Sequence, residues 1–159
     1  MGFGYTIRCK SCTYCFGAML GTGMLYSSAM AYRECDEDGQ PIICVSVKDK
    51  SIRKKVSDIL DDNTCTEEYY EDLYICPKCM RFANGFYFKL NTSSGEYIPE
   101  YRCEECETVL KRIKEVNSEK DNDGDRHLSF KYRNGRKVRW KCPECGCDKM
   151  TTDTMIMWD

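Results

Sequence analysis

The clearest periodic segment of the chain spans residues 48–63. Its apolar positions recur at helical spacing and form one stripe: Ile52, Val56, Ile59 and Leu60. Residues three or four positions apart share one face of a helix, so this pattern predicts an amphipathic helix with its charged residues in solvent. Residues 66–72 are polar and begin with Thr66, a potential N-cap, and we expect a second short helix there.

Shorter apolar and alternating segments predict β-strands in both halves of the chain. We expect strands at residues 41–47, 82–90, 96–102, 127–133 and 137–141. The last two flank Asn134-Gly135, a pair typical of tight hairpin turns. Residues 108–116 alternate imperfectly and fit either a strand or a helix. Residues 16–26 are rich in glycine, and we expect a connector rather than a phosphate-binding loop, because no lysine follows Gly23.

The hydrophobic core that this pattern predicts is small. Only 28 of the 159 residues are Leu, Ile, Val or Phe, whereas 13 are cysteine. A chain with so few core residues usually needs cross-links or metal ions to stabilise its fold. The formal net charge of −2 argues against binding of polyanions over the whole surface, but it is compatible with a local basic face.

The sequence predicts neither a transmembrane helix nor a signal peptide. It has no segment of about 20 consecutive apolar residues, and its first 20 residues carry Arg8, Lys10 and three cysteines. We therefore expect a cytoplasmic protein without a membrane partner. Disulfides are rare in that compartment, and an odd number of cysteines also fits a complete set of disulfides poorly.

Eight cysteines form four Cys-x-x-Cys pairs. Two intervening residues let a tight turn direct both sulfur atoms at one point, and two such turns complete the tetrahedral thiolate site of a structural zinc ion. We therefore expect two zinc ions with these ligands: Cys9, Cys12, Cys76, Cys79, Cys103, Cys106, Cys142 and Cys145. The remaining cysteines have no assigned role: Cys15, Cys35, Cys44, Cys65 and Cys147.

The sequence allows two ways to pair these turns. In the sequential pairing, which we favour, the first turn shares a metal with the second and the third with the fourth. In the nested pairing, the two inner turns share one metal and the two outer turns share the other. The strands predicted at 82–90 and 96–102 favour the nested pairing, because they would bring the inner turns together. Loop-closure entropy changes too slowly with length to decide between them.

The cysteine turns resemble those of the zinc-ribbon family. Residues 76–79 (Cys-Pro-Lys-Cys) and 142–146 (Cys-Pro-Glu-Cys-Gly) are similar to its Cys-Pro-x-Cys-Gly knuckle, and residues 9–14 are similar to a variant of it. Glycine is replaced after three of the four turns, by Thr13, Met80 and Glu107. The N-terminal part also resembles uncharacterised bacterial zinc-ribbon proteins.

This resemblance implies a small β-rich, metal-stabilised α+β fold of the zinc-ribbon type, with two four-cysteine sites. We expect an N-terminal ribbon unit at residues 1–99, which contains a helical insertion near 46–72. A C-terminal ribbon unit with a basic β-hairpin would follow at 100–159. Because zinc ribbons serve many processes, the resemblance implies a fold more strongly than a function.

The hairpin predicted at residues 126–141 concentrates positive charge. It contains seven cations and no acid: Arg126, Lys131, Arg133, Arg136, Lys137, Arg139 and Lys141. Alternate residues of a strand share a face, so we expect Lys131 and Arg133 on one face and Phe130 and Tyr132 on the other. A basic stripe suits a phosphate backbone, and nucleic acid is the partner we expect. The alternative is a face that balances neighbouring acids in a protein-binding adaptor of a bacterial or phage assembly.

Catalysis is not expected. His127 is the only histidine, which excludes a catalytic triad and a histidine-rich zinc site, and four cysteines leave a zinc ion no open position. No small-molecule substrate is evident. The outer cysteine turns are also similar to those of rubredoxin, which holds iron in the same thiolate cage, but this would require the nested pairing. The sequence thus predicts a non-catalytic binding protein.

Overall fold

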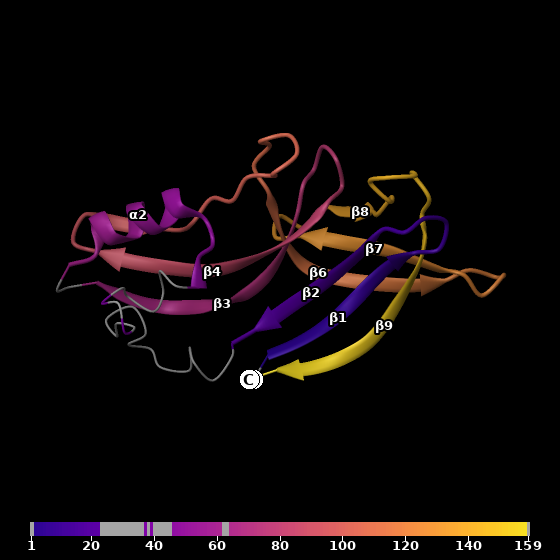
Figure 1. Ribbon diagram of the computed structural model, residues 1–159, viewed down its shortest axis with the longest axis horizontal. Coiled ribbons are helices and arrows are strands. Elements are labelled where there is room, and N and C mark those ends of the chain that lie inside the picture. The colour runs from indigo at the N-terminus through magenta and orange to yellow at the C-terminus, as the bar shows by residue number, and fades with distance from the viewer. Residues whose placement is uncertain (1, 23–36, 38, 40–45, 62–63, 159) are drawn as a thin grey trace.

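The computed structural model describes residues 2–22, 37, 39, 46–61 and 64–158, and in these it is mostly β-structure (Figure 1). The helix is α2 (Lys50–Ile59). The strands are β1 (Gly2–Cys9), β2 (Cys15–Gly21), β3 (Cys65–Ile75), β4 (Phe82–Thr92), β5 (Gly95–Tyr97), β6 (Lys111–Lys120), β7 (Arg126–Tyr132), β8 (Lys137–Arg139) and β9 (Lys149–Trp158). Within the described residues, no helix is both long and apolar enough to cross a membrane.

Six strands close into an antiparallel β-barrel. Their order is β2-β1-β9-β7-β6-β3, and the ring closes where Gly21 of β2 pairs with Glu71 of β3. Long ladders join β1 to β9 and β6 to β7, whereas β9 meets β7, and β3 meets β6, through two residue pairs each. β4 and β5 extend the sheet from β3, and β8 pairs with β7. The predicted zinc-ribbon α+β fold is therefore wrong.

Two strands account for most of this error. β1 was not predicted at all, and β2 occupies the segment in which we expected a glycine-rich connector. Both contain glycine, which is depleted in strands, in place of a regular alternation of β-branched residues. Pairing with neighbours distant in sequence, such as β1 with β9, makes these segments strands. Both predicted units, 1–99 and 100–159, contribute strands to the same barrel.

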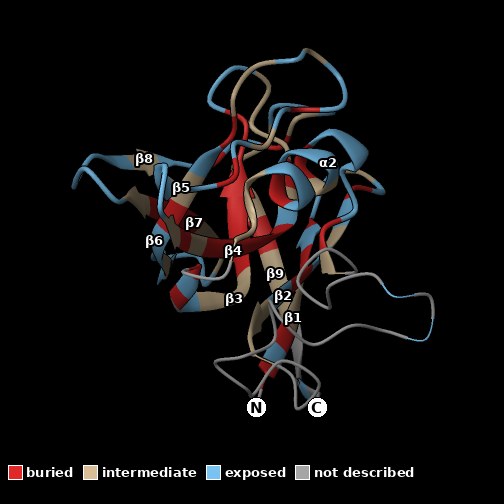
Figure 2. Ribbon diagram, turned by 90° about the vertical axis from the view of Figure 1, so that its left-hand side faces the viewer, coloured by how far each residue is buried: buried red, intermediate tan, exposed pale blue. Residues whose placement is uncertain are grey.

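The helix predicted within 48–63 is confirmed as α2. Asp49 caps its N-terminus by accepting hydrogen bonds from the backbone N–H groups of Ser51 and Ile52. Ile52 and Val56 are buried in the same apolar cluster as residues of β4. Figure 2 shows that α2 has both buried and exposed parts. The second helix predicted at 66–72 is wrong, because these residues belong to β3, which pairs with β4 along its length. The strand predicted at 41–47 lies mostly outside the described residues.

The C-terminal predictions agree better with the structure. The hairpin is confirmed, with β7 and β8 on either side of Asn134-Gly135, and Gly135 has the positive φ of 86° that this turn requires. The strand predicted at 82–90 is β4, and the one at 96–102 is reduced to β5. The ambiguous residues 108–116 lie largely in a strand, β6, which extends further, to Lys120.

Candidate metal centres

The structure brings the eight predicted cysteines together in two groups of four. Centre 1 contains Cys9, Cys12, Cys142 and Cys145, and centre 2 contains Cys76, Cys79, Cys103 and Cys106. Within each group all four sulfur atoms lie within 4.8 Å of one another, so each group could hold a metal ion. The sequential pairing that we favoured is wrong, and the nested pairing is observed.

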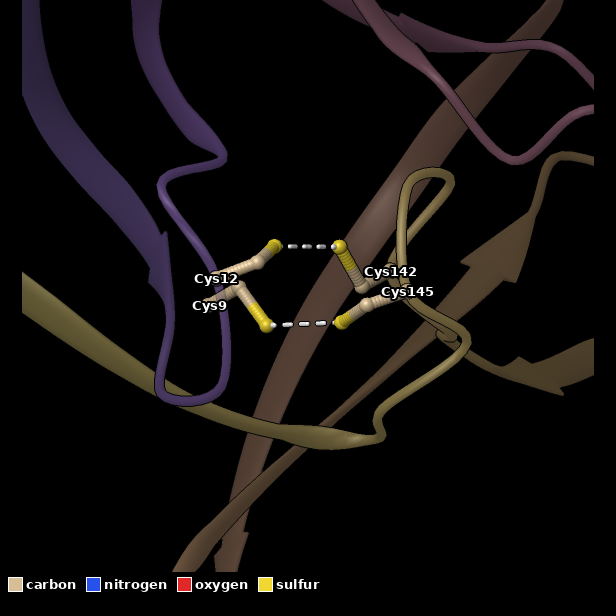
Figure 3. Close-up of side chains that lie close together, drawn as sticks. All are labelled: Cys9, Cys12, Cys142 and Cys145. Atoms are coloured by element: carbon tan, nitrogen blue, oxygen red, sulfur yellow. Dashed lines mark hydrogen bonds between the residues drawn. The ribbon is translucent and has the colours of Figure 1, made fainter.

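Centre 1 joins the beginning and the end of the chain (Figure 3). Cys9 ends β1, and the β1–β9 ladder places it opposite Met150, just after the turn that carries Cys142 and Cys145. The sulfur atoms of Cys9 and Cys145 are 3.5 Å apart, as are those of Cys12 and Cys142. These separations far exceed a disulfide bond of about 2.05 Å and suit neighbouring ligands of one ion.

Centre 2 has the same arrangement between the β3–β4 turn and the turn that precedes β6. The sulfur atoms of Cys76 and Cys106 are 3.5 Å apart, and so are those of Cys79 and Cys103. Cys76 is completely buried, and Cys103 is almost completely buried. The second pair of ligands is positioned by the bridge between Arg102 and Val109 on either side of its turn.

All four turns share one hydrogen-bond pattern. In each, the backbone N–H of the first cysteine donates to the carbonyl five residues later: Cys9 to Tyr14 (3.0 Å), Cys76 to Arg81 (2.9 Å), Cys103 to Thr108 (3.0 Å) and Cys142 to Cys147 (2.8 Å). In three turns a second bond returns to the first cysteine's carbonyl from Met80, Glu107 or Gly146. These three residues have positive φ values of 61°, 57° and 72°. Met80 and Glu107 thus adopt the conformation that glycine usually supplies.

The ionisation of the thiols in centre 2 indicates why a cation suits it. Burial and the neighbouring thiols raise the pKa of Cys79 to about 12. By contrast, the hydroxyl and backbone of Thr108 lower the pKa of Cys106 to about 6. Four adjacent thiolates repel one another, so they cannot all ionise unless a positive ion lies among them. The donor set therefore fits a metal ion that four sulfur atoms surround completely.

Cys147 lies beside centre 1 without belonging to it. Its sulfur atom is 3.0 Å from the hydroxyl of Ser11, which donates to it, and it accepts a hydrogen bond from the backbone N–H of Lys149 at 3.3 Å. Cys15 and Cys65 are exposed and lie in neither group. Cys35 and Cys44 are outside the described residues.

The predicted basic hairpin consists of β7, β8 and the residues next to them, and none of its seven cations is a cysteine ligand. Phe130 and Trp140 are completely buried, so these aromatic rings belong to the core and are not available to stack on bases. Lys131 lies directly opposite Lys137 in the β7–β8 ladder. Like charges in such positions destabilise a sheet.

Acids neutralise only part of this charge. Lys137 pairs with Glu119 at 2.8 Å, and Arg139 pairs with Asp148 at 2.9 Å. Among the described residues, no acidic side chain pairs with the other five cations, which are Arg126, Lys131, Arg133, Arg136 and Lys141. Glu119 and Asp148 could not be named as the balancing acids from the sequence, because both lie outside the hairpin and reach it only in the folded structure.

Comparison with known proteins found no family model that matches the chain, no matching curated protein and no matching solved structure. The resemblance to zinc ribbons therefore rests on the four cysteine turns.

Proposed function

We propose that this is a non-catalytic binding protein whose fold is held by two structural zinc ions and whose basic hairpin contacts nucleic acid. The observation that carries the second part is the set of five hairpin cations that have no acidic partner among the described residues. Lysine and arginine side chains on one strand pair can neutralise successive phosphates without reading the bases. Since Phe130 and Trp140 are buried, we expect binding that depends strongly on salt and weakly on sequence.

Zinc is the ion that the cysteine centres suit best. Structural zinc sites are tetrahedral and are commonly formed by four cysteines from two Cys-x-x-Cys turns, as both centres are. Backbone N–H groups also stabilise the thiolates, as Ser11 does for Cys9 at 3.4 Å. An ion held in this way has no free position for substrate, and its contribution would be to folding.

The proposed contact of the hairpin with nucleic acid is tested by removing three cations that have no acidic partner among the described residues. Arg133, Arg136 and Lys141 are all exposed, and we expect their triple replacement by alanine to weaken binding of a labelled random-sequence oligonucleotide by at least about tenfold in low salt. The slope of log affinity against log salt should become smaller by about 2 to 3. Fluorescence anisotropy with single- and double-stranded probes measures both quantities.

A matched control changes the net charge equally at another site. Lys50, Lys54 and Lys55 are exposed on α2, and their triple replacement by alanine should leave the affinity within about twofold if the contact is local. An equal loss in both variants would show that only net charge matters. Absence of binding by the unmodified protein would exclude nucleic acid and leave a protein partner as the better hypothesis.

Electron transfer is the second candidate, because it depends on how the cysteine turns are paired and the structure has the required pairing. A rubredoxin-like site requires the two outer cysteine turns to share one ion, and centre 1 has this pairing. Metal analysis together with a visible absorption spectrum, on protein purified without added metal, separates the two functions. Two zinc ions and no visible absorption support the structural role, whereas iron with thiolate charge-transfer bands would make electron transfer the better proposal.

A further inference from the structure

Side chains of the barrel line a cavity of about 500 Å³ that opens to solvent and to which the predicted function assigns no role. Every strand of the six-stranded ring contributes to its lining. The apolar part includes Phe3 and Tyr5 of β1, Leu20 of β2, Leu73 of β3, Val116 of β6 and Leu128 of β7, and Thr152 comes from β9. Closed β-barrels with space between their side chains commonly hold one small ligand, and this volume lies in the usual range of ligand pockets.

The cavity differs from the part of the barrel next to centre 1, which is filled. There the rings of Phe82 and Trp140 stack with centroids 5.8 Å apart, and Phe82 meets Phe130 edge-on at 6.4 Å. Along the cavity, by contrast, Leu20 and Val116 are only half-buried and Phe3 is 43% exposed. Apolar surface left uncovered in this way is stabilised when an apolar molecule displaces water from it.

The charged groups at the cavity do not select a charged ligand. The carboxylate of Asp72 is already engaged, since it accepts hydrogen bonds from Arg112 at 2.7 Å and from the backbone N–H of Leu73. The other two charges, Lys114 and Glu115, are of opposite sign and exposed. The charges at the cavity therefore cancel: Lys114 is balanced by Glu115, and Asp72 is balanced by Arg112.

The hydroxyl of Tyr5 is one of the polar groups of the lining that can orient a ligand. In the part of the chain that the structure describes, the hydroxyl of Tyr5 has no hydrogen-bond partner. Burial raises the pKa of Tyr5 to about 12, so the hydroxyl keeps its proton near neutral pH and can donate it. A pocket of this kind, apolar with one placed donor, is typical of small-molecule sites.

We propose that the barrel cavity binds an uncharged, largely apolar small molecule that carries one hydrogen-bond acceptor, and that Tyr5 donates to this acceptor. The lining includes none of the seven hairpin cations and none of the cysteine ligands. Occupation of the cavity and the nucleic-acid contact can therefore be measured independently.

The probe for this site is 6-propionyl-2-(dimethylamino)naphthalene, a neutral aromatic ketone whose emission shifts to the blue in apolar surroundings. With the metal-loaded full chain we expect a saturable blue shift. Leu20→Trp places a larger side chain in the cavity and should weaken binding by at least about tenfold. Met19→Trp adds the same bulk on the neighbouring residue of β2, whose side chain points to the other face, and should change the affinity by less than about twofold.

A second variant tests the hydrogen bond without changing the volume of the lining. Tyr5→Phe should weaken binding of the ketone by roughly two- to tenfold, the range for one neutral hydrogen bond. The same variant should leave unchanged the affinity for N-phenyl-1-naphthylamine, which has a similar apolar surface and no carbonyl. Each variant is first checked for the thermal transition of the unmodified protein. Absence of a blue shift with the unmodified protein, or equal affinities of Leu20→Trp and Met19→Trp, would overturn the proposal.

Discussion

Two residues next to the cysteine ligands have a backbone conformation that does not suit them. Met80 and Glu107 have φ values of 61° and 57°, equivalent to that of Gly146 in the fourth turn. A side chain in this left-handed region clashes with its own backbone at a cost of roughly 1–2 kcal/mol. The turn keeps this conformation because the N–H of each residue donates to the carbonyl of the first cysteine, at 3.0 Å for Met80 and 2.9 Å for Glu107.

Glu107→Gly should therefore stabilise the metal-loaded protein by about 0.5–1 kcal/mol, the relief of strain less the greater entropy of glycine in the unfolded chain. Glu107 is exposed, so little packing is lost. Urea unfolding with constant metal occupancy measures the change. Glu104→Gly is the control, because Glu104 lies in the same turn without a positive φ, and it should destabilise by about 0.5 kcal/mol. Equal effects of the two changes would contradict the explanation by strain.

At the scale of single residues, the sequence indicated which cysteines come together in the structure. The eight ligands could be named in advance, because a Cys-x-x-Cys turn is a local motif whose geometry depends on a few adjacent residues. The structure places all eight in the two groups. The partners of each turn could not be named, because they are chosen by strand pairing between residues such as Cys9 and Met150, which are distant in sequence.

Between elements, the weakest junction of the barrel is that of β2 with β3, which has a single residue pair. A side chain of β4 supplements it. The amide of Asn84 donates to the carbonyl of Gly17 at 2.8 Å and accepts from the N–H of Met19 at 3.0 Å. These two hydrogen bonds take the place of a backbone pair at the edge of β2, and they attach β2 to the β3–β4 pair.

Asn84→Ala should destabilise the protein by roughly 1–2 kcal/mol, since it removes both hydrogen bonds. It should also accelerate amide exchange at Met19 more than at residues of the β1–β9 ladder, because the loss is confined to one edge. Hydrogen exchange followed by NMR measures the local effect. Asn122→Ala, in an exposed loop, serves as the control and should change neither quantity. Uniform acceleration across the barrel would indicate that Asn84 acts on global stability instead.

The elements themselves were only partly predictable. The helix α2 and the β7–β8 hairpin carry local signals, namely an apolar stripe and an Asn-Gly turn, and both were predicted. Residues 66–72 of β3 have the pattern of a helix that starts with a cap at Thr66, which is why the sequence predicts a short helix there. The pairing of β3 with β4 over ten residue pairs outweighs that preference. Strands defined by distant partners leave little trace in their own composition.

On the scale of the whole molecule, the two centres differ in what they connect. Centre 2 joins turns within the middle of the chain, between Cys76 and Cys106. Centre 1 joins the turn after β1 to the turn before β9, and these are the strands that bring both ends of the chain into the barrel. With few aliphatic residues to compensate, we expect a metal ion at each centre to be needed to offset the entropy of closing the barrel.

Loss of either metal should therefore unfold the protein. Binding of a structural zinc ion supplies about 10–16 kcal/mol at neutral pH, which is comparable to the whole stability of a typical domain, about 5–15 kcal/mol. We expect Cys76→Ser and Cys142→Ser, both at buried ligands, to lose the cooperative thermal transition. A strong chelator should abolish it in the unmodified protein, and added zinc should restore it.

Cys65→Ser is the matched control, since Cys65 is exposed and belongs to neither centre. It should keep both metal ions and the thermal transition, which circular dichroism and metal analysis report together. A ligand variant that lost one ion and still unfolded cooperatively near the original temperature would mean that the barrel is stable without that connection. In that case the aromatic cluster of Phe82, Phe130 and Trp140, rather than the metal, would be the main source of stability.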